Sequence, residues 1–187
     1  EFKIIQDKSS MKVGTDGVLL GSWVSCKDFN NILDVGCGTG LITLMLAQRN
    51  ATSNITGIEI DKRSSQEAQL NIFNSKWAER IEIQNTALQN FKTKRKFDLI
   101  VSNPPFFAKN KSQKRRDIAR HTNTLSFEEL IHNAINLLSE QGVFSVIIPK
   151  ASENNFCKIA TINKLYNNRI CYIKGNEKSE VKRVMIE

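Results

Sequence analysis

The fold is decided by the stretch NILDVGCGTG, residues 31–40, together with LITLMLAQ, residues 41–48. Ile32, Leu33 and Val35 are typical of a strand buried on both faces, and the second stretch has the composition of a helix. Between them, glycines occupy positions 36, 38 and 40. A glycine-rich turn from a buried strand into a helix is where a doubly wound sheet binds its ligand, because glycine permits positive φ and a close approach of the backbone.

This turn differs from the common phosphate-binding motifs. The pattern G-x-G-x-x-G is not met, since residue 41 is leucine and residue 43 is threonine, and the lysine of a P-loop is absent. Asp34 lies at the end of the strand instead. A carboxylate there favours a ligand that carries an ammonium and a sulfonium over one that carries phosphates.

A second carboxylate follows the next predicted strand, residues 54–60. This strand ends in Gly57-Ile58-Glu59-Ile60-Asp61, about 20 residues after the turn, the spacing at which such folds hold a ribose diol. Glu59 is the better candidate for that contact. Asp61 is equally suited to capping the helix that follows.

Short apolar runs alternate with helical patterns along the rest of the chain, which predicts an α/β fold with a doubly wound, mostly parallel sheet. Strands are predicted at residues 31–35, 54–60, 81–83, 97–102 and 142–148, with one or two more after residue 162, and helices at 41–48, 64–74, 126–138 and 152–162. Ser126 and Glu129 have the spacing of a capping box. In helix 64–74, Ala68, Ile72 and Phe73 are expected to share one face.

Both ends of the chain, residues 1–5 and 184–187, have strand-like sequences. We therefore expect one domain, residues 1–187, in a chain that is incomplete at both ends. At 187 residues with 40% hydrophobic content, the chain is long enough to bury a core. Four cysteines without disulfide-like spacing favour a reducing compartment, the cytoplasm, and no apolar run approaches the length of a membrane helix.

The sequence SNPPFF, residues 102–107, follows the fourth predicted strand and carries the clearest chemistry. The exocyclic amino group of adenine is a poor nucleophile, because its lone pair is delocalised into the ring. Acceptors for its hydrogens, such as the Asn103 side-chain oxygen and the Pro104 carbonyl, would localise that lone pair. Pro104 and Pro105 would hold these acceptors rigidly, and Phe106 would offer a surface on which the base stacks. Phe107 is better suited to packing.

Methyl transfer at such a corner is an in-line displacement that depends on alignment of the reactants. It requires neither a metal nor a general base. His121 and His132, the two histidines of the chain, are eleven residues apart without neighbouring metal-type ligands, so no metal site is expected. The same corner could also be only a rigid turn with a buried aromatic side chain.

A basic segment follows the corner, and the chain as a whole has a formal net charge of +8. We expect this segment to contact the phosphates of an RNA, which gives affinity without reading sequence. Its residues are Lys109, Lys111, Lys114, Arg115, Arg116 and Arg120, with His121 as a further substrate contact. A second basic cluster, residues 92–96, is interpreted as solvated surface, which is also the alternative for the first.

Three stretches resemble the bacterial tRNA(Val) (adenine(37)-N6)-methyltransferase family, within the class I S-adenosylmethionine-dependent methyltransferases. They are MKVGTDGVLLGSW at residues 11–23, the turn at 34–40, and SNPPFF at 102–107. Residues 119–121 and 125–127 extend the likeness, which therefore spans nearly the whole chain. The resemblance implies a seven-stranded sheet with an antiparallel strand near the C-terminus, S-adenosylmethionine as cofactor, and N6-methylation of the adenosine beside the anticodon of a valine tRNA.

The resemblance also implies the cofactor contacts. The N-terminal segment, residues 1–25, would pack near the cofactor's amino-acid end through Lys12, Thr15 and Asp16. The remaining contacts would come from Asp34, Gly36, Cys37, Gly38, Gly40, Glu59, Ile60, Asn85, Thr86 and Asn103. Where relatives commonly carry an acidic residue that accepts from the adenine amino group of the cofactor, this chain has Thr86-Ala87. Asn85 and Gln89 are the candidate substitutes.

Other functions share part of this pattern. The same corner occurs in enzymes that methylate guanine N2 of rRNA, adenine of DNA or a glutamine side chain of a protein. The basic segment and the short chain disfavour a protein glutamine, the short chain disfavours DNA, and rRNA guanine stays open. A non-catalytic RNA-binding protein with a degenerate cofactor site is the alternative from another class, favoured by Ala87 and disfavoured by the intact Asn103–Phe106 motif. We expect a monomer.

Overall fold

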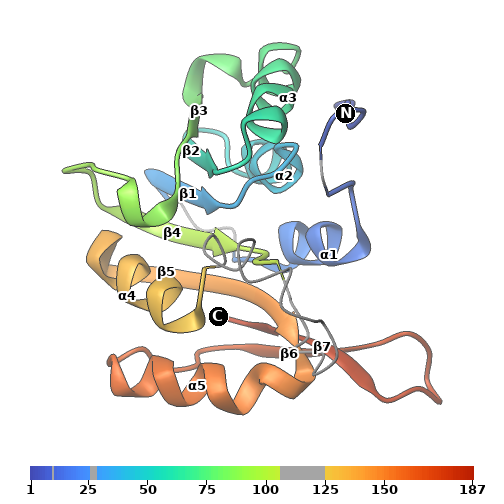
Figure 1. Cartoon of the computed structure of the whole chain (residues 1–187), viewed down its shortest axis with the longest axis vertical. Coiled ribbons are helices and arrows are strands. Elements are labelled where there is room, and N and C mark those ends of the chain that lie inside the picture. The colour runs from blue at the N-terminus through green and yellow to red at the C-terminus, as the bar shows by residue number, and fades with distance from the viewer. Residues whose placement is uncertain (10, 26–28, 106–124) are drawn as a thin grey trace, which may run out of the picture.

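The computed structural model describes residues 1–9, 11–25, 29–105 and 125–187, and these build one seven-stranded sheet (Figure 1). The strand order is β3 (Ile81–Asn85), β2 (Asn54–Glu59), β1 (Asn31–Val35), β4 (Phe97–Ser102), β5 (Leu138–Pro149), β7 (Val181–Ile186) and β6 (Ile170–Lys174). The first five strands of this order are parallel, and β7 runs antiparallel to both β5 and β6. The predicted fold class is therefore confirmed.

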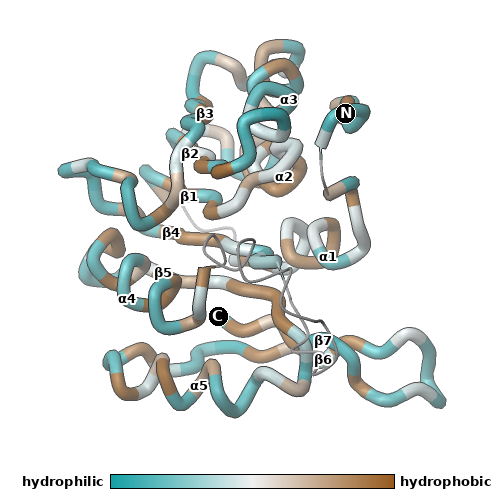
Figure 2. The backbone as a smooth tube through the Cα atoms, in the orientation of Figure 1, coloured by the Kyte–Doolittle hydropathy of each residue, from teal (hydrophilic) through white to brown (hydrophobic). Residues whose placement is uncertain are grey.

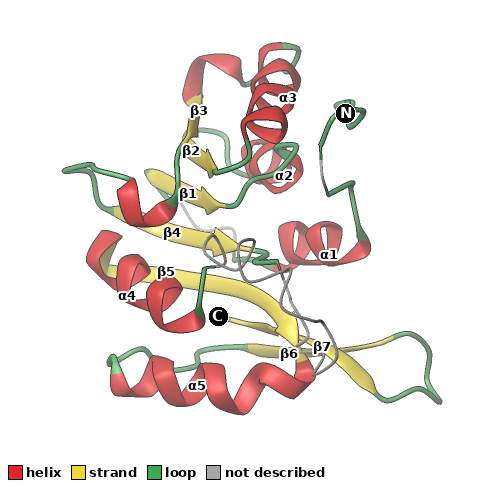
Figure 3. Ribbon diagram, viewed as in Figure 1, coloured by secondary structure: helices red, strands yellow, loops and turns green. Residues whose placement is uncertain are grey.

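Within the described ranges, five α-helices cover the two faces of the sheet (Figure 3). One face packs against α1 (Thr15–Trp23), α2 (Leu41–Arg49) and α3 (Lys62–Phe73), and the other against α4 (Phe127–Leu137) and α5 (Glu153–Ile162). Short 3-10 turns lie at Ala78–Arg80, Leu88–Asn90 and Lys150–Ser152. The layering explains why the central strands read as continuous apolar runs, since both of their faces are covered.

The central strands form the core. Ile32 and Leu33 of β1 and Leu99 and Ile100 of β4 are fully buried, and Figure 2 shows the hydrophobic colour concentrated along these strands. Because successive residues of a strand point to opposite faces, each strand contributes to both layers. The core thereby fixes the positions at which β1 and β4 end, where the predicted site lies.

Two helix starts form as their sequences predict. Ser126 caps α4, with its side chain accepting from the Glu129 backbone while the Glu129 carboxylate accepts from the Ser126 backbone. The Asp61 carboxylate accepts from the backbone and hydroxyl of Ser64, so it caps α3. These hydrogen bonds lower the pKa of Asp61. Of its two predicted roles, Asp61 thus has the capping role.

Two local predictions are wrong. Residues 1–5 form no strand, because the backbone N–H and carbonyl of Ile5 bond to the side-chain amide of Asn71 at 2.8 Å and 2.9 Å, which holds this segment along α3. Phe73 is 78% exposed, whereas Ala68 and Ile72 are buried. A residue five positions after Ala68 lies well round the helix from it, so the three side chains cannot share one face.

Helix α1 is attached to segments that are distant in sequence. The Glu187 carboxylate accepts from the Ser25 hydroxyl at 2.6 Å, just after α1, and from the buried Ser145 hydroxyl of β5 at 3.0 Å. Arg169 donates to the Trp23 carbonyl at 2.8 Å and lies 4.1 Å above the Trp23 ring. Residues 169–187 therefore hold the C-terminal end of α1 against the sheet.

Candidate active site

The glycine turn between β1 and α2 has the backbone that its sequence predicts. Gly36, Gly38 and Gly40 have φ of +73°, +55° and +82°, a region in which other L-residues are strained. The Gly36 and Cys37 backbone amides donate to the Ile58 carbonyl at 2.9 Å and 3.0 Å, which ties the turn to β2. A Cβ added at Gly36 or Gly38 would meet nothing within 4 Å. The turn thus leaves space where a side chain would otherwise stand.

Asp34 lies beneath this turn. It is completely buried, and its Oδ2 atom accepts from the Thr43 hydroxyl at 2.6 Å. Its Oδ1 atom has no hydrogen-bond partner among the residues that the structure describes. Burial raises the pKa of Asp34 to about 7, against the hydrogen bonds from Thr43, and the charge of Glu59 adds to the increase. A buried carboxylate with an unpaired oxygen is suited to a cationic group, which would satisfy its charge.

Cys37 lies within the turn and is also buried. Burial raises the pKa of its thiol, and the neighbouring carboxylates of Asp34 and Glu59 raise it further. Cys37 is therefore a protonated thiol that fills space beside Gly57, whose added Cβ would lie 3.1 Å from the Cys37 sulfur. Its predicted contact with the cofactor would come from the backbone.

Glu59 lies at the end of β2, beside the turn. Its Oε2 atom accepts from the Gly38 backbone at 2.9 Å, and its Oε1 atom accepts from the Asp61 backbone at 2.8 Å. Each carboxylate oxygen can accept a second hydrogen bond, so Glu59 can hold the turn and still bind a pair of hydroxyls. Ile60, the next residue, has an apolar side chain that is 50% exposed.

Asn85 ends β3 directly opposite Glu59 in the strand register. Its side-chain nitrogen donates to the Glu59 carbonyl at 2.8 Å and to the Ile60 carbonyl at 3.0 Å. Both amide hydrogens are thereby used, and the side-chain oxygen has no partner within the described ranges. The Thr86 backbone also donates to the Glu59 carbonyl, at 3.0 Å. In contrast, Gln89 donates to Glu129 of α4 at 3.2 Å. Asn85 is thus the better placed of the two candidate substitutes.

The predicted catalytic corner follows β4, beside β1. The Ser102 hydroxyl donates to the Val35 carbonyl at 2.9 Å, so the ends of these two strands are held together. Asn103 is half-buried, Pro104 is buried and Pro105 is exposed. A Cβ added at Gly17 of α1 would lie 3.9 Å from the Asn103 side-chain nitrogen. Helix α1 therefore lies against the Asn103 side chain, at the same sheet edge as the glycine turn.

The N-terminal residues are placed differently from one another. Lys12 and Thr15 are exposed at the start of α1, while Asp16 accepts from the Arg183 guanidinium of β7 at 2.8 Å. This ion pair joins residues separated by 167 positions, and the sequence contains no local signal for it. The segment before α1 does approach the turn, because the Asn71 side chain that holds Ile5 also donates to the Thr39 carbonyl at 2.9 Å.

Several predicted site residues lie outside the described residues. They are Phe106, Lys109, Lys111, Lys114, Arg115, Arg116, Arg120 and His121, together with Phe107. Their contacts with substrate remain predictions. His132 is exposed on α4, and within the described ranges no three side chains of the His, Cys, Asp and Glu type are grouped as metal ligands.

Comparison with known proteins identifies the family. A family model described as Methyltransferase small domain matches residues 9–168. A tRNA1(Val) (adenine(37)-N6)-methyltransferase from Flavobacterium psychrophilum is 44% identical over 191 residues, which include all of this chain and 82% of the relative. The protein of the same name from Phocaeicola vulgatus is 43% identical over 188 residues, covering all of this chain and 80% of the relative. The chain belongs to this methyltransferase family. The resemblance inferred from the three sequence stretches is thus confirmed.

Solved structures similar to this methyltransferase share its fold. A predicted O-methyltransferase from Agrobacterium tumefaciens superposes with a TM-score of 0.70 at 18% identity, covering 92% of this chain and 79% of the other. A human methyltransferase 10 domain containing protein has a TM-score of 0.65 at 15% identity, covering 99% and 88%. Among the described residues, no helix of the methyltransferase is long and apolar enough to span a membrane.

Proposed function

We propose that this methyltransferase transfers the methyl group of S-adenosylmethionine to N6 of an adenine in tRNA, the adenosine at position 37 of tRNA(Val). The observation that carries the proposal is the meeting of three features at one sheet edge: the glycine turn after β1, Glu59 after β2 and Asn103 after β4. The relatives named as tRNA1(Val) (adenine(37)-N6)-methyltransferases support the choice of acceptor.

The residues of this edge fit S-adenosylmethionine, which supplies an electrophilic methyl group on a sulfonium. The unpaired Oδ1 atom of Asp34 suits the positive end of the molecule. The open space beside Gly36 and Gly38 would let the cofactor approach the protein backbone closely. Glu59 can accept further hydrogen bonds, which suits a ribose diol. The Asn85 side-chain oxygen would accept from the adenine amino group, and the exposed side chain of Ile60 would contact the ring.

On the acceptor side, Asn103 performs the central role. Its side-chain oxygen accepts a hydrogen from the N6 amino group, and the Pro104 carbonyl accepts the second. The lone pair of N6 would then be directed at the methyl carbon. The new carbon–nitrogen bond would form as the carbon–sulfur bond breaks, S-adenosylhomocysteine would be the leaving group, and the extra proton of the amino group would pass to water. The proximity of α1 and the Ser102–Val35 hydrogen bond would help to hold the acceptors in place, and alignment of the reactants contributes much of the rate of such a transfer.

Several features of the wider molecule belong to the same proposal. The described residues share one continuous sheet, which supports a single domain over residues 1–187. The basic residues between positions 109 and 120, with His121, would bind the tRNA backbone beside the base at Asn103. Phe106 would stack on that base.

The test is transfer of labelled methyl from S-adenosylmethionine to unmodified tRNA, followed by nucleoside analysis. We expect N6-methyladenosine confined to tRNA(Val), and loss of transfer in Asn103→Ala with cofactor binding largely intact. The control Asn90→Ala, which changes an exposed asparagine of a 3-10 turn, should transfer normally. Normal turnover by Asn103→Ala would contradict the role of Asn103. Label in rRNA, DNA or protein would change the acceptor, and no cofactor binding at all would indicate a non-catalytic protein.

A further inference from the structure

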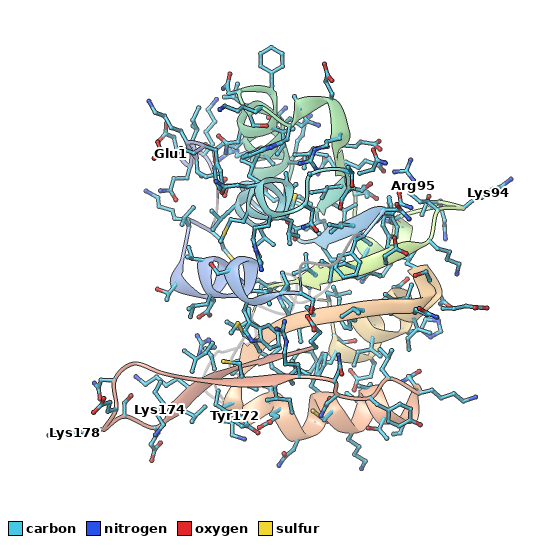
Figure 4. All side chains as sticks on the ribbon, turned by 180° about the vertical axis from the view of Figure 1, so that it is seen from behind. Glu1, Lys94, Arg95, Tyr172, Lys174 and Lys178 are labelled. Atoms are coloured by element: carbon cyan, nitrogen blue, oxygen red, sulfur yellow. The ribbon has the colours of Figure 1, made fainter. Side chains whose placement is uncertain are left out.

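The β6–β7 hairpin projects from the sheet beyond the helices, as Figure 1 shows at the right of the view. Three of its lysines are exposed: Lys174 at the end of β6, Lys178 in the turn and Lys182 in β7. None of the three forms an ion pair with any residue that the structure describes. Figure 4 shows Lys174 and Lys178 at the outer end of this hairpin. The function proposed above assigns no role to these charges.

The turn of the hairpin is well defined by hydrogen bonds. The Asn176 backbone donates to the Ser179 hydroxyl at 3.0 Å, and the Ser179 backbone donates back to the Asn176 carbonyl at 3.2 Å. The Lys178 backbone donates to the Asn176 side-chain oxygen at 3.0 Å. Lys178 is therefore presented from an ordered turn.

The hairpin lies at the same edge of the sheet as the catalytic corner. Ser102 at the end of β4 is paired with Val146 of β5, and Pro149 at the end of β5 is paired with Arg183 near the start of β7. The end of β6 and the start of β7 are thus at the edge where β4 ends. Three strand spacings separate β4 from β6, about 14 Å, a distance that a few nucleotides of RNA can cover.

The hairpin is also connected to α1, the helix that lies against Asn103. Arg183 of β7 pairs with Asp16 of α1, one residue before the glycine that lies against Asn103. On the other side of the hairpin, Lys150 pairs with the buried carboxylate of Glu153, which also accepts from the Tyr172 hydroxyl at 2.8 Å. The carboxylates of Asp16 and Glu153 are therefore matched by Arg183 and Lys150 and form no ion pair with the three lysines.

We propose that the β6–β7 hairpin binds phosphates of the tRNA on the side of the base away from the glycine turn. This proposal rests on the tRNA substrate proposed above. Lysines on a projecting hairpin can each neutralise one phosphate, which adds affinity and salt dependence without reading sequence. Two exposed glutamates of the same hairpin, Glu177 and Glu180, oppose this attraction and provide a test of opposite sign.

The experiment measures binding of a labelled tRNA(Val) transcript by fluorescence anisotropy over a series of salt concentrations. The hairpin variant carries Lys174→Gln, Lys178→Gln and Lys182→Gln. The matched control carries Lys92→Gln, Lys94→Gln and Arg95→Gln, which removes the same charge from exposed residues just before β4, at the opposite edge of the sheet. Figure 4 shows Lys94 and Arg95 on the side of the molecule away from Lys174 and Lys178.

We expect the hairpin variant to bind tRNA at least tenfold more weakly at about 0.1 M salt, with a salt slope lower by about 2, because each phosphate contact contributes about 0.7–0.9 to the slope. The control should retain most of the affinity. Glu177→Gln with Glu180→Gln should bind tRNA more tightly. S-adenosylmethionine should bind all variants equally, which separates lost RNA contacts from misfolding.

The outcomes separate the two proposals. If the unaltered protein binds tRNA and the hairpin variant binds it as well as the control does, the hairpin proposal is wrong and the proposed function stands. If the unaltered protein binds no tRNA but binds S-adenosylmethionine, the tRNA substrate is wrong, and the hairpin proposal is overturned with it.

Discussion

Asp34→Asn should make the cofactor-free protein more stable, and increasingly so as the pH rises. The substitution keeps a side-chain oxygen for the Thr43 hydroxyl but removes a carboxylate that is completely buried with one oxygen unpaired. Burial raises the pKa of Asp34 from its ordinary value of 3.8 to about 7. Between these values the folded protein retains a proton that the unfolded chain has lost, so the stability of the unaltered protein falls as pH rises through this window and levels off above pH 7.

The size of the effect follows from the two pKa values of Asp34. The unfavourable contribution of its ionisation to folding should grow by about 2.5 kcal/mol between pH 5 and pH 8, since one pKa unit corresponds to about 1.4 kcal/mol. Titrating groups that lie away from Asp34 contribute equally to both proteins and cancel in the difference. The difference in free energy of unfolding between Asp34→Asn and the unaltered protein should therefore increase by this amount.

Urea unfolding followed by tryptophan fluorescence at pH 5, 6, 7 and 8 measures this difference. Thr43→Val provides a second comparison. The Thr43 hydroxyl lowers the Asp34 pKa, so its loss should move the fall in stability to higher pH. At pH 7.5, Asp34→Asn should also bind S-adenosylmethionine at least tenfold more weakly, opposite in sign to its effect on stability. A stability difference that does not change with pH would refute the raised pKa of Asp34 and the reasoning built on it.

Three further substitutions test cofactor binding at the glycine turn and Asn85, and packing at Gly57. Gly38→Ala should reduce the free energy of unfolding by about 1–2 kcal/mol, because φ is +55° there. It should also weaken S-adenosylmethionine binding, because the new methyl group fills open space. If a binding titration gives an unchanged affinity, the cofactor does not use this space. Gly57→Ala should reduce the free energy of unfolding by about 1–3 kcal/mol, since its Cβ would lie 2.6 Å from the Ile83 side chain. An unchanged midpoint of urea unfolding would mean that the Ile83 side chain moves aside freely. Asn85→Leu should weaken cofactor binding about three- to tenfold, which is the contribution of one hydrogen bond. It should also remove the preference for S-adenosylhomocysteine over its inosine analogue, which lacks the adenine amino group. Asn90→Leu is the control for Asn85→Leu, and a retained preference would assign adenine recognition to another group.

Much of the site could be predicted from the sequence where the signal is local. Alternate glycines after an apolar strand specify a turn with positive φ, and all three glycines have it. The spacing of Ser126 and Glu129 specifies a capping box, which forms. In both cases the residues that interact lie within a few positions of one another, so that residue type and spacing contain the information.

The remaining features depend on distant contacts. Helix α1 was not predicted, because two of its buried positions, Gly17 and Gly21, are glycines that allow close packing against α2 and Asn103. The depth of Asp34 beneath the turn and the anchoring of the Asn85 amide depend on how neighbouring strands align. The pairing of Asp16 with Arg183 joins residues 167 positions apart, and spacing along the chain contains no information about it.

The attachment of α1 to residues 169–187 also determines an order of assembly during synthesis. Asp16, Trp23 and Ser25 find their partners in Arg183, Arg169 and Glu187, which leave the ribosome about 160 residues later. A nascent chain can build the parallel part of the sheet, with its glycine turn, before α1 is held in place. The three contacts that anchor α1 to residues 169–187 are therefore among the last to form, after α1 has been able to pack against α2.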